Sequence, residues 1–262
     1  MIKNQAQTPL FKIFGGKLRS QIRCEKCDYR SDTFDETFTL NLPLPRGKDC
    51  SFGEALDQFF AIDKLTKDNK YKCPVCKSLQ NATKRLSVNV APRILIVTIK
   101  RFDIFGRKIT KSIRYPASFN MKTFMDAHID AQTAAKASNK RKNASASQLA
   151  STKVIGDQIY DLYGVVIHVG SSTNSGHYYA YCKNMQNNAW YQCNDSHISS
   201  LASESGALNK EAYMLFYQKR YTPAPEPKLK VKKLPQEYEV EESKISTCSK
   251  PSSKSKPAME EV

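Results

Sequence analysis

The residues with the clearest chemical potential are a histidine on a predicted strand and four cysteines in two pairs. His177 directly follows Gly176 in the stretch GSSTNSGHYYAYCKN. An imidazole titrates near neutral pH, and this histidine is therefore a candidate general base. A histidine between aromatic residues on a strand is also often a packed residue with a structural role, and the stretch alone leaves both interpretations open.

The residues that follow His177 predict a β-hairpin. GHYYAYCKN is one extended stretch, NMQNNA is a turn, and WYQCND is a returning strand. If Lys183 pairs with Trp190, Asn194 lies opposite Tyr179, diagonal to His177 and on the same face of the sheet. A side-chain amide in this position would orient the imidazole, and the pair would be the base half of a cysteine-protease triad.

The same alternation places Cys182 and Cys193 on the opposite face of the predicted hairpin. Neither thiol is then positioned to exchange a proton with His177. We expect both to be buried thiols with a packing role.

Four other cysteines form two CxxC pairs, Cys24 with Cys27 and Cys73 with Cys76. Each pair supplies two thiolates from one tight turn, and two such pairs complete the tetrahedral four-thiolate shell that suits zinc. Because four protein ligands leave no open coordination position, the predicted zinc is structural and not catalytic. Two disulfides or four ordinary thiols are the alternatives, and a chain without a secretory signal favours metal binding over disulfides.

Strand patterns dominate the chain around these residues. Three apolar runs predict buried strands: ILIVTIKRF from Ile94, YDLYGVVIHV from Tyr160 and EAYMLFYQK from Glu211. One helix is predicted over residues 51–60, where Ser51 is the N-cap, Glu54 completes a capping box and one face is apolar. The predicted fold class is therefore α+β, with antiparallel sheet predominating.

Two stretches have compositions typical of disorder. Residues 130–153 are rich in Ala, Ser, Asn and Lys and contain almost no large apolar side chain. We expect a disordered insertion there, with a short helix as the alternative because of its alanines. After Tyr221 the chain becomes rich in Pro, Lys, Ser and Glu, and residues 221–262 are predicted to be a disordered basic tail.

Composition limits the class of protein. The chain has 262 residues, of which 40% are hydrophobic, and a formal net charge of +16. The sequence shows neither a signal peptide nor a membrane-spanning run, so we expect a nuclear or cytosolic location and no membrane partner. A basic chain suits nucleic acid, but the charge is spread over many segments, and we do not expect nucleic acid to be the main partner.

Four motifs, taken in order along residues 11–218, resemble those of the ubiquitin-specific protease family. FGGKLRSQIRCEKC resembles the entry to that family's zinc-binding fingers, and APRILIVTIKRFD resembles its strand ending in Lys-Arg-Phe. YGVVIHVGSSTNSGHYYAYCKN resembles the histidine box, and WYQCNDSHIS resembles the closing box. The details are most similar to the branch of large, basic and often nucleolar enzymes in this family.

This resemblance implies a papain-like fold, with fingers at about residues 20–90 and a palm at about residues 91–220, which together make a partial catalytic domain over residues 1–220. The implied activity is deubiquitination, the thiol-dependent hydrolysis of the bond at the C-terminal glycine of ubiquitin in protein conjugates. Ubiquitin and ubiquitinated proteins are the implied partners. The paired cysteines of the fingers would hold a structural zinc ion.

The resemblance also assigns catalytic roles. His177 would be the general base, Asn194 would orient it, and Asp195 would be a neighbour able to share that role. The family's nucleophilic cysteine lies in an N-terminal box upstream of the fingers, and no stretch of this sequence resembles that box. We expect a piece of an active enzyme, with a short product that has lost catalysis and one half of a split assembly as alternatives.

Substrate contacts follow from the same resemblance. The loop GSSTNSG, which begins at Gly170, would be mobile and would enclose the C-terminal tail of ubiquitin together with a facing loop at residues 104–108. Gly170, Gly176 and Tyr178 are the implied contacts. A side chain at Gly176 would narrow a channel that has to pass a Gly-Gly tail.

Two other functions remain open on the sequence. One is a non-catalytic ubiquitin-binding module, in which the fingers hold ubiquitin without turnover. The other is a zinc-stabilised nucleic-acid binder. Because the thumb subdomain of the family would pack against one side of the palm, we expect this chain to expose an apolar surface there, and the isolated chain to bind hydrophobic dyes or aggregate.

Overall fold

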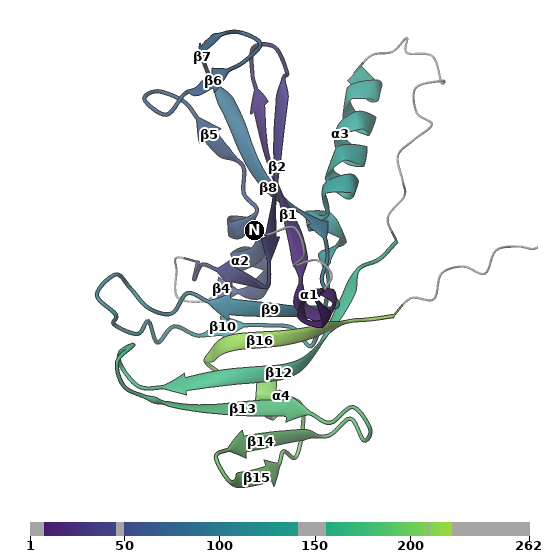
Figure 1. Cartoon of the computed structure of the whole chain (residues 1–262). Coiled ribbons are helices and arrows are strands. Elements are labelled where there is room, and N and C mark those ends of the chain that lie inside the picture. The colour runs from purple at the N-terminus through teal and green to yellow at the C-terminus, as the bar shows by residue number, and fades with distance from the viewer. Residues whose placement is uncertain (1–7, 46–49, 141–155, 209, 222–262) are drawn as a thin grey trace, which may run out of the picture. The chain divides into compact units, whose positions relative to one another are not determined.

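A sheet of eight strands forms the palm of the computed structural model, which describes residues 8–45, 50–140, 156–208 and 210–221 (Figure 1). Seven strands lie in the order β15-β14-β13-β12-β16-β9-β3, and β11 pairs with β12. Every pair is antiparallel except β3 with β9, which is parallel. The strands are β3 (Thr39–Leu42), β9 (Ile94–Ile99), β11 (Ser118–Asn120), β12 (Ile159–Val169), β13 (His177–Lys183), β14 (Trp190–Asn194), β15 (His197–Ser200) and β16 (Ala212–Lys219). The α+β class and the three apolar strands predicted from the sequence are confirmed.

Side-chain alternation explains why these runs form strands with one buried face. In β9, the side chains of Leu95, Val97 and Ile99 are buried while those between them are partly exposed. β12 has two register shifts against β16, and the extra residue at the second shift is Tyr213 of β16. The pairing of β12 with β13 is unbroken, so Ile167 and His168 lie on opposite faces of the sheet, and both are buried. His168 therefore lies on the same face as its partner Tyr178, next to the loop that leads to His177.

The fingers are a second sheet of four strands, in the order β2-β1-β8-β5, with a β6–β7 hairpin at the far end (Figure 1). These strands are β1 (Gly16–Cys24), β2 (Arg30–Thr37), β5 (Asp63–Leu65), β6 (Tyr71–Cys73), β7 (Ser78–Gln80) and β8 (Ala82–Val90). β1 and β8 pair from Lys17 and Val90 at the base to Cys24 and Ala82 at the tip. This long pair carries the first CxxC knuckle away from the palm.

Helix α2 (Phe52–Phe59) begins with the predicted capping box. Ser51 Oγ accepts the backbone N–H of Glu54 at 3.2 Å, and Glu54 Oε2 accepts the backbone N–H of Ser51 at 2.7 Å. The segment lies within the sequence range assigned to the fingers, but its buried face belongs to the palm core. The Phe52 ring packs 5.0 Å from Phe119 and 5.5 Å from Tyr217, so apolar packing and not chain order decides where the helix sits.

The other helical segments are short except for one. They are α1 (Pro9–Phe14), the 3₁₀ helix η2 (Met121–Phe124), α3 (Asp126–Lys140) and α4 (Ser205–Leu208), and β4 (Cys50–Ser51) pairs with β10 (Ile113–Arg114) beside α2. Helix α3 corrects the prediction of disorder over residues 130–153, because residues 130–140 are helical. Residues 141–153 of that prediction lie outside the described residues, as does the predicted tail beyond Tyr221.

A buried arginine explains why α3 forms without an apolar composition. Arg19 of β1 donates two hydrogen bonds to the carboxylate of Asp130, at 2.7 and 3.0 Å, and lies 3.9 Å from Asp126. Asp126 is itself buried and accepts a hydrogen bond from Asn89 at 2.7 Å. The contacts of Arg19 with helix α3 join residues more than a hundred positions apart, which local composition does not reveal. Among the described residues, no helix has the length and apolar character needed to cross a bilayer.

We predict that Ser51→Ala lowers the free energy of unfolding by about 1 kcal/mol, because it removes the acceptor for the N–H of Glu54. Denaturant unfolding monitored by circular dichroism measures this change. Ser200→Ala is the control, since Ser200 is exposed on β15 and should change stability by less than about 0.5 kcal/mol. Equal effects of the two substitutions would contradict the capping role.

Candidate active site and metal centre

The β13–β14 hairpin brings His177 and Asn194 together. Lys183 pairs with Trp190 as predicted. Ala180 pairs with Cys193, so the next residue of each strand places Asn194 opposite Tyr179, as predicted. His177 Nε2 and Asn194 Oδ1 are 2.5 Å apart. The side chain of His177 is 47% exposed, so the ring is accessible to a reacting group.

The hydrogen bond assigns the tautomer of the neutral imidazole. An amide oxygen only accepts hydrogen bonds, so Nε2 of His177 carries the proton that Asn194 Oδ1 accepts. Nδ1 is then the nitrogen with a free lone pair. This arrangement suits an imidazole that takes a proton from a thiol, with the amide fixing its orientation.

Asp195 lies near the same imidazole but is not its direct partner. Its Oδ2 is 3.9 Å from His177 Nε2, beyond hydrogen-bond distance, and its side chain is 78% exposed. The residue has a positive φ of 52° in the tight turn that joins Asn194 to His197. The amide is thus the group that holds the ring in this structure, and the sharing of the role by Asp195 stays a prediction.

The two glycines of the 170–176 loop are explained by close packing. A Cβ added to Gly176 would lie 2.2 Å from His168 Nε2 and 2.6 Å from the carbonyl oxygen of Val169. Gly170 has φ of +146°, and its added Cβ would lie 2.7 Å from the carbonyl oxygen of Ser175. We expected a glycine at 176 in order to keep a channel wide, whereas the structure requires it because the His168 ring occupies the space.

Tyr178, the third predicted substrate contact, is half exposed at the start of β13. Its ring centroid lies 4.7 Å from that of His168 and 6.0 Å from that of Tyr213. One side of the Tyr178 ring therefore packs against His168 and Tyr213, while the remainder is exposed and available to a ligand.

The two loops expected to face each other are directly paired. Arg107 forms an isolated antiparallel bridge with Ser172, in which the N–H of Lys108 donates to the Ser171 carbonyl at 2.7 Å. The N–H of Thr173 donates to the Gly106 carbonyl at 3.0 Å. The loop of residues 104–108 and the loop of residues 170–176 thus form one joined unit in front of His177.

The expectation that Cys182 and Cys193 are buried is wrong. Cys182 is exposed and Cys193 is partly exposed. Both lie on the face of the hairpin opposite His177, as the alternation predicted, but the described residues leave that face largely open to solvent. Of the seven described cysteines, none has a hydrogen bond to His177.

The four paired cysteines converge into one cluster at the tip of the fingers. The sulfur atoms of Cys24, Cys27, Cys73 and Cys76 all lie within 4.8 Å of one another, and those of Cys27 and Cys73 are 3.6 Å apart. A zinc ion with bonds of about 2.3 Å to four sulfurs requires sulfur separations of roughly 3.8 Å. The cluster therefore matches the size of a four-thiolate metal shell.

The two knuckles share the same backbone conformation. Asp28 and Lys77, each directly after the second cysteine of its pair, have positive φ values of 59° and 55°. In the second knuckle, burial alone would raise the pKa of Cys73, but backbone N–H groups of Cys76 and Val75 and the neighbouring thiols lower this pKa to about 7. N–H groups directed at a sulfur stabilise a thiolate, which is the form that binds a metal.

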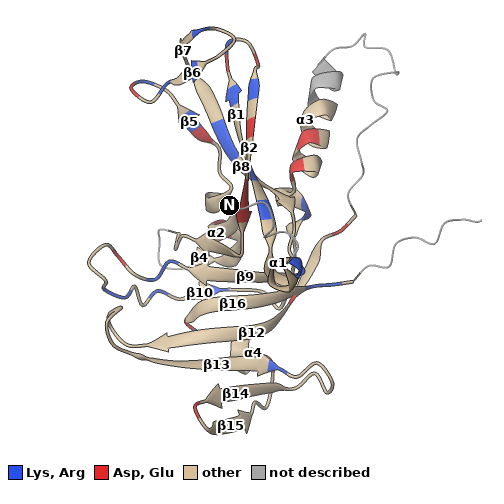
Figure 2. Cartoon of the chain, in the orientation of Figure 1, with Lys and Arg blue, Asp and Glu red and all other residues tan. Residues whose placement is uncertain are grey.

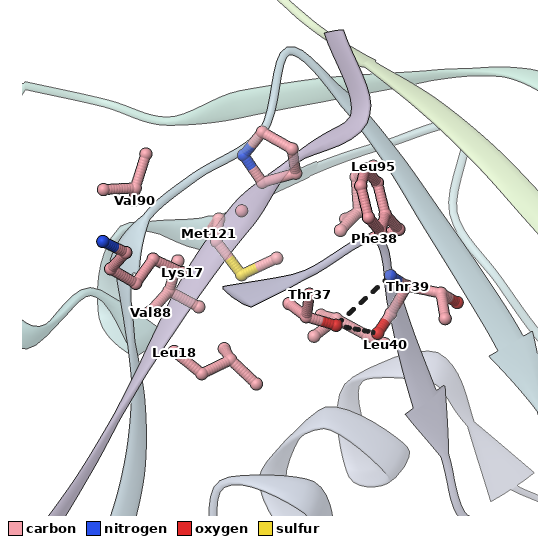
Figure 3. Close-up of a pocket in the computed structure, with 12 residues that line it drawn as sticks. Lys17, Leu18, Thr37, Phe38, Thr39, Leu40, Val88, Val90, Leu95 and Met121 are labelled. Atoms are coloured by element: carbon pink, nitrogen blue, oxygen red, sulfur yellow. Dashed lines mark hydrogen bonds between the residues drawn. The ribbon is translucent and has the colours of Figure 1, made fainter. Parts of the chain in front are cut away.

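An apolar cleft lies apart from both centres, between the base of the fingers and the palm (Figure 3). Its lining includes Leu18, Phe38, Leu40, Val90 and Leu95, and the only ionisable side chain among the lining residues is that of Lys17. Phe38 and Val90 are 45% and 50% exposed. The residues that line this cleft include none of the candidate catalytic residues, and the expected apolar surface for a thumb subdomain stays a prediction.

Three residues that help to build the site were missed from the sequence: Arg101, Lys108 and His168. Arg101 is 1% exposed and donates to the carbonyls of Ala212 and Lys111, at 2.5 and 2.6 Å, so it joins the two segments that flank the 104–108 loop. The only sequence signal for His168 was a polar residue inside the apolar run YGVVIHV. Nothing in the local pattern distinguished Lys108 from the other lysines of the chain.

Comparison with known proteins identifies the family. The family model described as ubiquitin carboxyl-terminal hydrolase matches residues 2–217, which is most of the chain. The chain belongs to the ubiquitin carboxyl-terminal hydrolase family. It is 36% identical over 221 residues to the probable ubiquitin carboxyl-terminal hydrolase 16 of Schizosaccharomyces pombe, and 34% identical over 214 residues to the human ubiquitin carboxyl-terminal hydrolase 42.

Solved structures support the same family. The structure of the SAGA Ubp8/Sgf11/Sus1/Sgf73 DUB module bound to ubiquitin aldehyde matches with a TM-score of 0.65 and 30% identity, over 84% of this chain and 45% of that one. The fission yeast and human relatives match over 83% and 81% of this chain, which corresponds to 42% and 14% of their own lengths. The chain thus spans less than half the length of these relatives.

We predict that Gly176→Ala destabilises the protein by about 1–3 kcal/mol, because the added methyl group clashes with His168 and the Val169 carbonyl. Thermal unfolding measures the loss, and hydrogen exchange should locate it at the 170–176 loop and the start of β13. Gly206→Ala is the control, since its nearest neighbour would be an ordinary 3.5 Å contact with Leu201. A Gly176→Ala protein as stable as the Gly206→Ala protein would refute the packing argument.

Proposed function

We propose that this chain supplies the histidine and asparagine half of a deubiquitinase active site, which hydrolyses the bond after the C-terminal glycine of ubiquitin in protein conjugates. The observation that supports this most directly is the 2.5 Å contact between His177 Nε2 and Asn194 Oδ1 on a half-exposed imidazole. Family membership supplies the substrate class, and the match to a DUB module bound to ubiquitin aldehyde supports ubiquitin as the partner.

In the proposed reaction, Nδ1 of His177 accepts the proton of a cysteine thiol, and the resulting thiolate attacks the carbonyl carbon of the scissile bond. The imidazolium then returns that proton to the leaving amine as the carbon–nitrogen bond breaks, and an acyl-thioester remains. Water, deprotonated by the same imidazole, hydrolyses the thioester and regenerates the thiol. Asn194 keeps the imidazole oriented through each proton transfer.

The proposed nucleophile lies outside the described residues. Cys24, Cys27, Cys73 and Cys76 form the metal cluster, and Cys182 and Cys193 occupy the far face of the hairpin. Cys50 is buried and its thiol donates to the carbonyl of Ser112 at 3.0 Å. This distribution also favours a second candidate function, a ubiquitin-binding module without turnover, whenever no partner segment supplies a thiol.

For the cysteine cluster, we infer a structural zinc ion. Its four thiolates would leave no position for substrate, and its effect would be to join the end of β1 to the β6–β7 hairpin at the tip of the fingers. The short β6–β7 hairpin has few other contacts that could stabilise it. A nuclear or cytosolic location stays a prediction from composition.

The charge pattern does not favour the nucleic-acid alternative. Figure 2 shows basic and acidic segments interleaved along the strands of the fingers. Several of the basic side chains already form ion pairs within the chain: Lys17 with Glu36, Arg19 with Asp130 and Arg23 with Asp28. Binding of a nucleic-acid phosphate backbone needs a continuous stripe of free cationic side chains, and these ion pairs leave fewer such side chains free.

We predict that His177→Ala lowers kcat/KM by at least about a thousandfold in a form of the protein that carries the nucleophile, and that Asn194→Ala lowers it less. The substrate is a fluorogenic amide of the ubiquitin C-terminus, and ubiquitin affinity measured by calorimetry should change by less than about threefold. His197→Ala is the control, because His197 is an exposed neighbour in β15.

Three results would contradict this assignment. Loss of ubiquitin binding together with activity in the His177 variant would indicate a structural histidine. Ubiquitin binding by the unaltered protein without any turnover would support the non-catalytic module. Salt-sensitive binding to RNA without affinity for ubiquitin would support the nucleic-acid binder.

We also predict one equivalent of zinc per chain, and its loss in Cys73→Ser. Removal of the metal by a chelator should expose the amides of β1, β6 and β8 to hydrogen exchange before those of the palm. Cys182→Ser is the matched control, since Cys182 is exposed and remote from the cluster in the fingers. A metal-free chain with protected fingers would refute the structural zinc.

A further inference from the structure

Lys108 is an unusual lysine, because it lies at the edge of a candidate active site and is almost fully buried. Its side chain is 6% exposed, whereas a lysine normally keeps its ammonium group in water. Burial of a charge is unfavourable unless hydrogen bonds and opposite charges compensate for it. The contacts of this ammonium therefore indicate what it does.

Lys108 contacts three segments that are distant in the sequence, two through its ammonium and one through its backbone N–H. Its Nζ donates to the carbonyl oxygen of His168 at 2.6 Å, and His168 lies near the C-terminal end of β12. The same Nζ lies 3.6 Å from the carboxylate of Glu211, the residue directly before β16. The backbone N–H of Lys108 donates to Ser171, in the 170–176 loop, at 2.7 Å. Lys108 itself belongs to the facing loop.

The carbonyl that Lys108 binds belongs to the residue on which the loop rests. The His168 side chain is 2% exposed and fits against Gly176, where a Cβ would lie 2.2 Å from Nε2. Its ring also packs on Tyr178 and Phe102, at centroid distances of 4.7 and 5.4 Å. A displacement of His168 therefore displaces the residues on both sides of His177.

The charge of Lys108 also affects the protonation of that ring. Burial, and then the neighbouring ammonium, lower the pKa of His168. The Nδ1 atom of His168 is buried and has no hydrogen-bond partner among the described residues. A lowered pKa favours the neutral form of the His168 ring, and its contacts are those of a packed side chain.

We propose that Lys108 is a positioning residue, whose buried ammonium fixes the end of β12, the entry to β16 and the two facing loops in one arrangement and thereby sets the place of His177. The proposal deepens the proposed function, since it concerns the same site. Lys108 does not touch the reacting atoms. It acts through the carbonyl of His168 and through the 170–176 loop.

Hydrogen exchange of the chain without any ligand tests the proposal independently of ubiquitin. Lys108→Met keeps the length and apolar stem of the side chain but removes the ammonium. We expect amide exchange in residues 169–177 to become faster on the order of tenfold or more, because a charge-assisted hydrogen bond is lost. The amides of β1 and β8 in the fingers should be unchanged and serve as the internal reference.

Two variants provide the comparison. Lys108→Arg retains the charge and its donors and should restore exchange to within about threefold of the unaltered protein. Lys100→Met removes a charge from a nearby exposed lysine and should have no effect on the loop. In NMR spectra, the ring signals of His177 should shift in Lys108→Met, return toward their original position in Lys108→Arg and stay in place in Lys100→Met.

Unchanged exchange and unchanged His177 signals in Lys108→Met would overturn the proposal. Faster exchange throughout the palm and the fingers would also overturn it, in favour of a general role in stability. Ubiquitin binding is measured separately, and we expect Lys108→Met to weaken it at least about threefold. If the unaltered protein does not bind ubiquitin, the proposed function fails, while the exchange and NMR results still decide the role of Lys108.

Discussion

The register of β13 between its two neighbours is the constraint on which the candidate site depends. Successive side chains of a strand point to opposite faces, so a shift of one residue would exchange the face of His177 with that of Cys182. Two large side chains prevent this shift. Tyr181 and Trp190 are each 3% exposed, and a slipped pairing would bring one of them into water, at a loss of about 2–3 kcal/mol of burial free energy. The packing of the palm therefore fixes the distance between the histidine and the asparagine.

The loops in front of the histidine depend on the same sheet. His168 is buried at the end of β12 by the rings of Phe102, Tyr178 and Tyr213, and it leaves room only for a glycine at position 176. The facing loop is attached through Arg101 and Lys108, two buried cations whose donors are directed at backbone carbonyls. The position of the candidate imidazole thus depends on groups that do not contact it directly.

The fingers obey a different constraint, because they have little apolar core of their own. Their strands are held at the base by pairing and by the contacts of Arg19 with helix α3, and at the tip by the four cysteines. A zinc ion at the tip would connect two knuckles separated by residues 28–72.

Local patterns in the sequence determined the hairpin that pairs His177 with Asn194, the capping box of Ser51 and Glu54, and the grouping of the cysteines. Each of these depends on side-chain period or on contacts between near neighbours, which the order of residues displays directly. Only the tertiary structure decided that residues 130–140 are helical, that Cys182 is exposed, and that Lys108 and His168 contact each other beside the 170–176 loop. The deciding contacts join residues 111 positions apart for Arg19 with Asp130 and 60 positions apart for Lys108 with His168. Burial and hydrogen bonding over such separations arise from packing of the whole domain, and no window of sequence contains them.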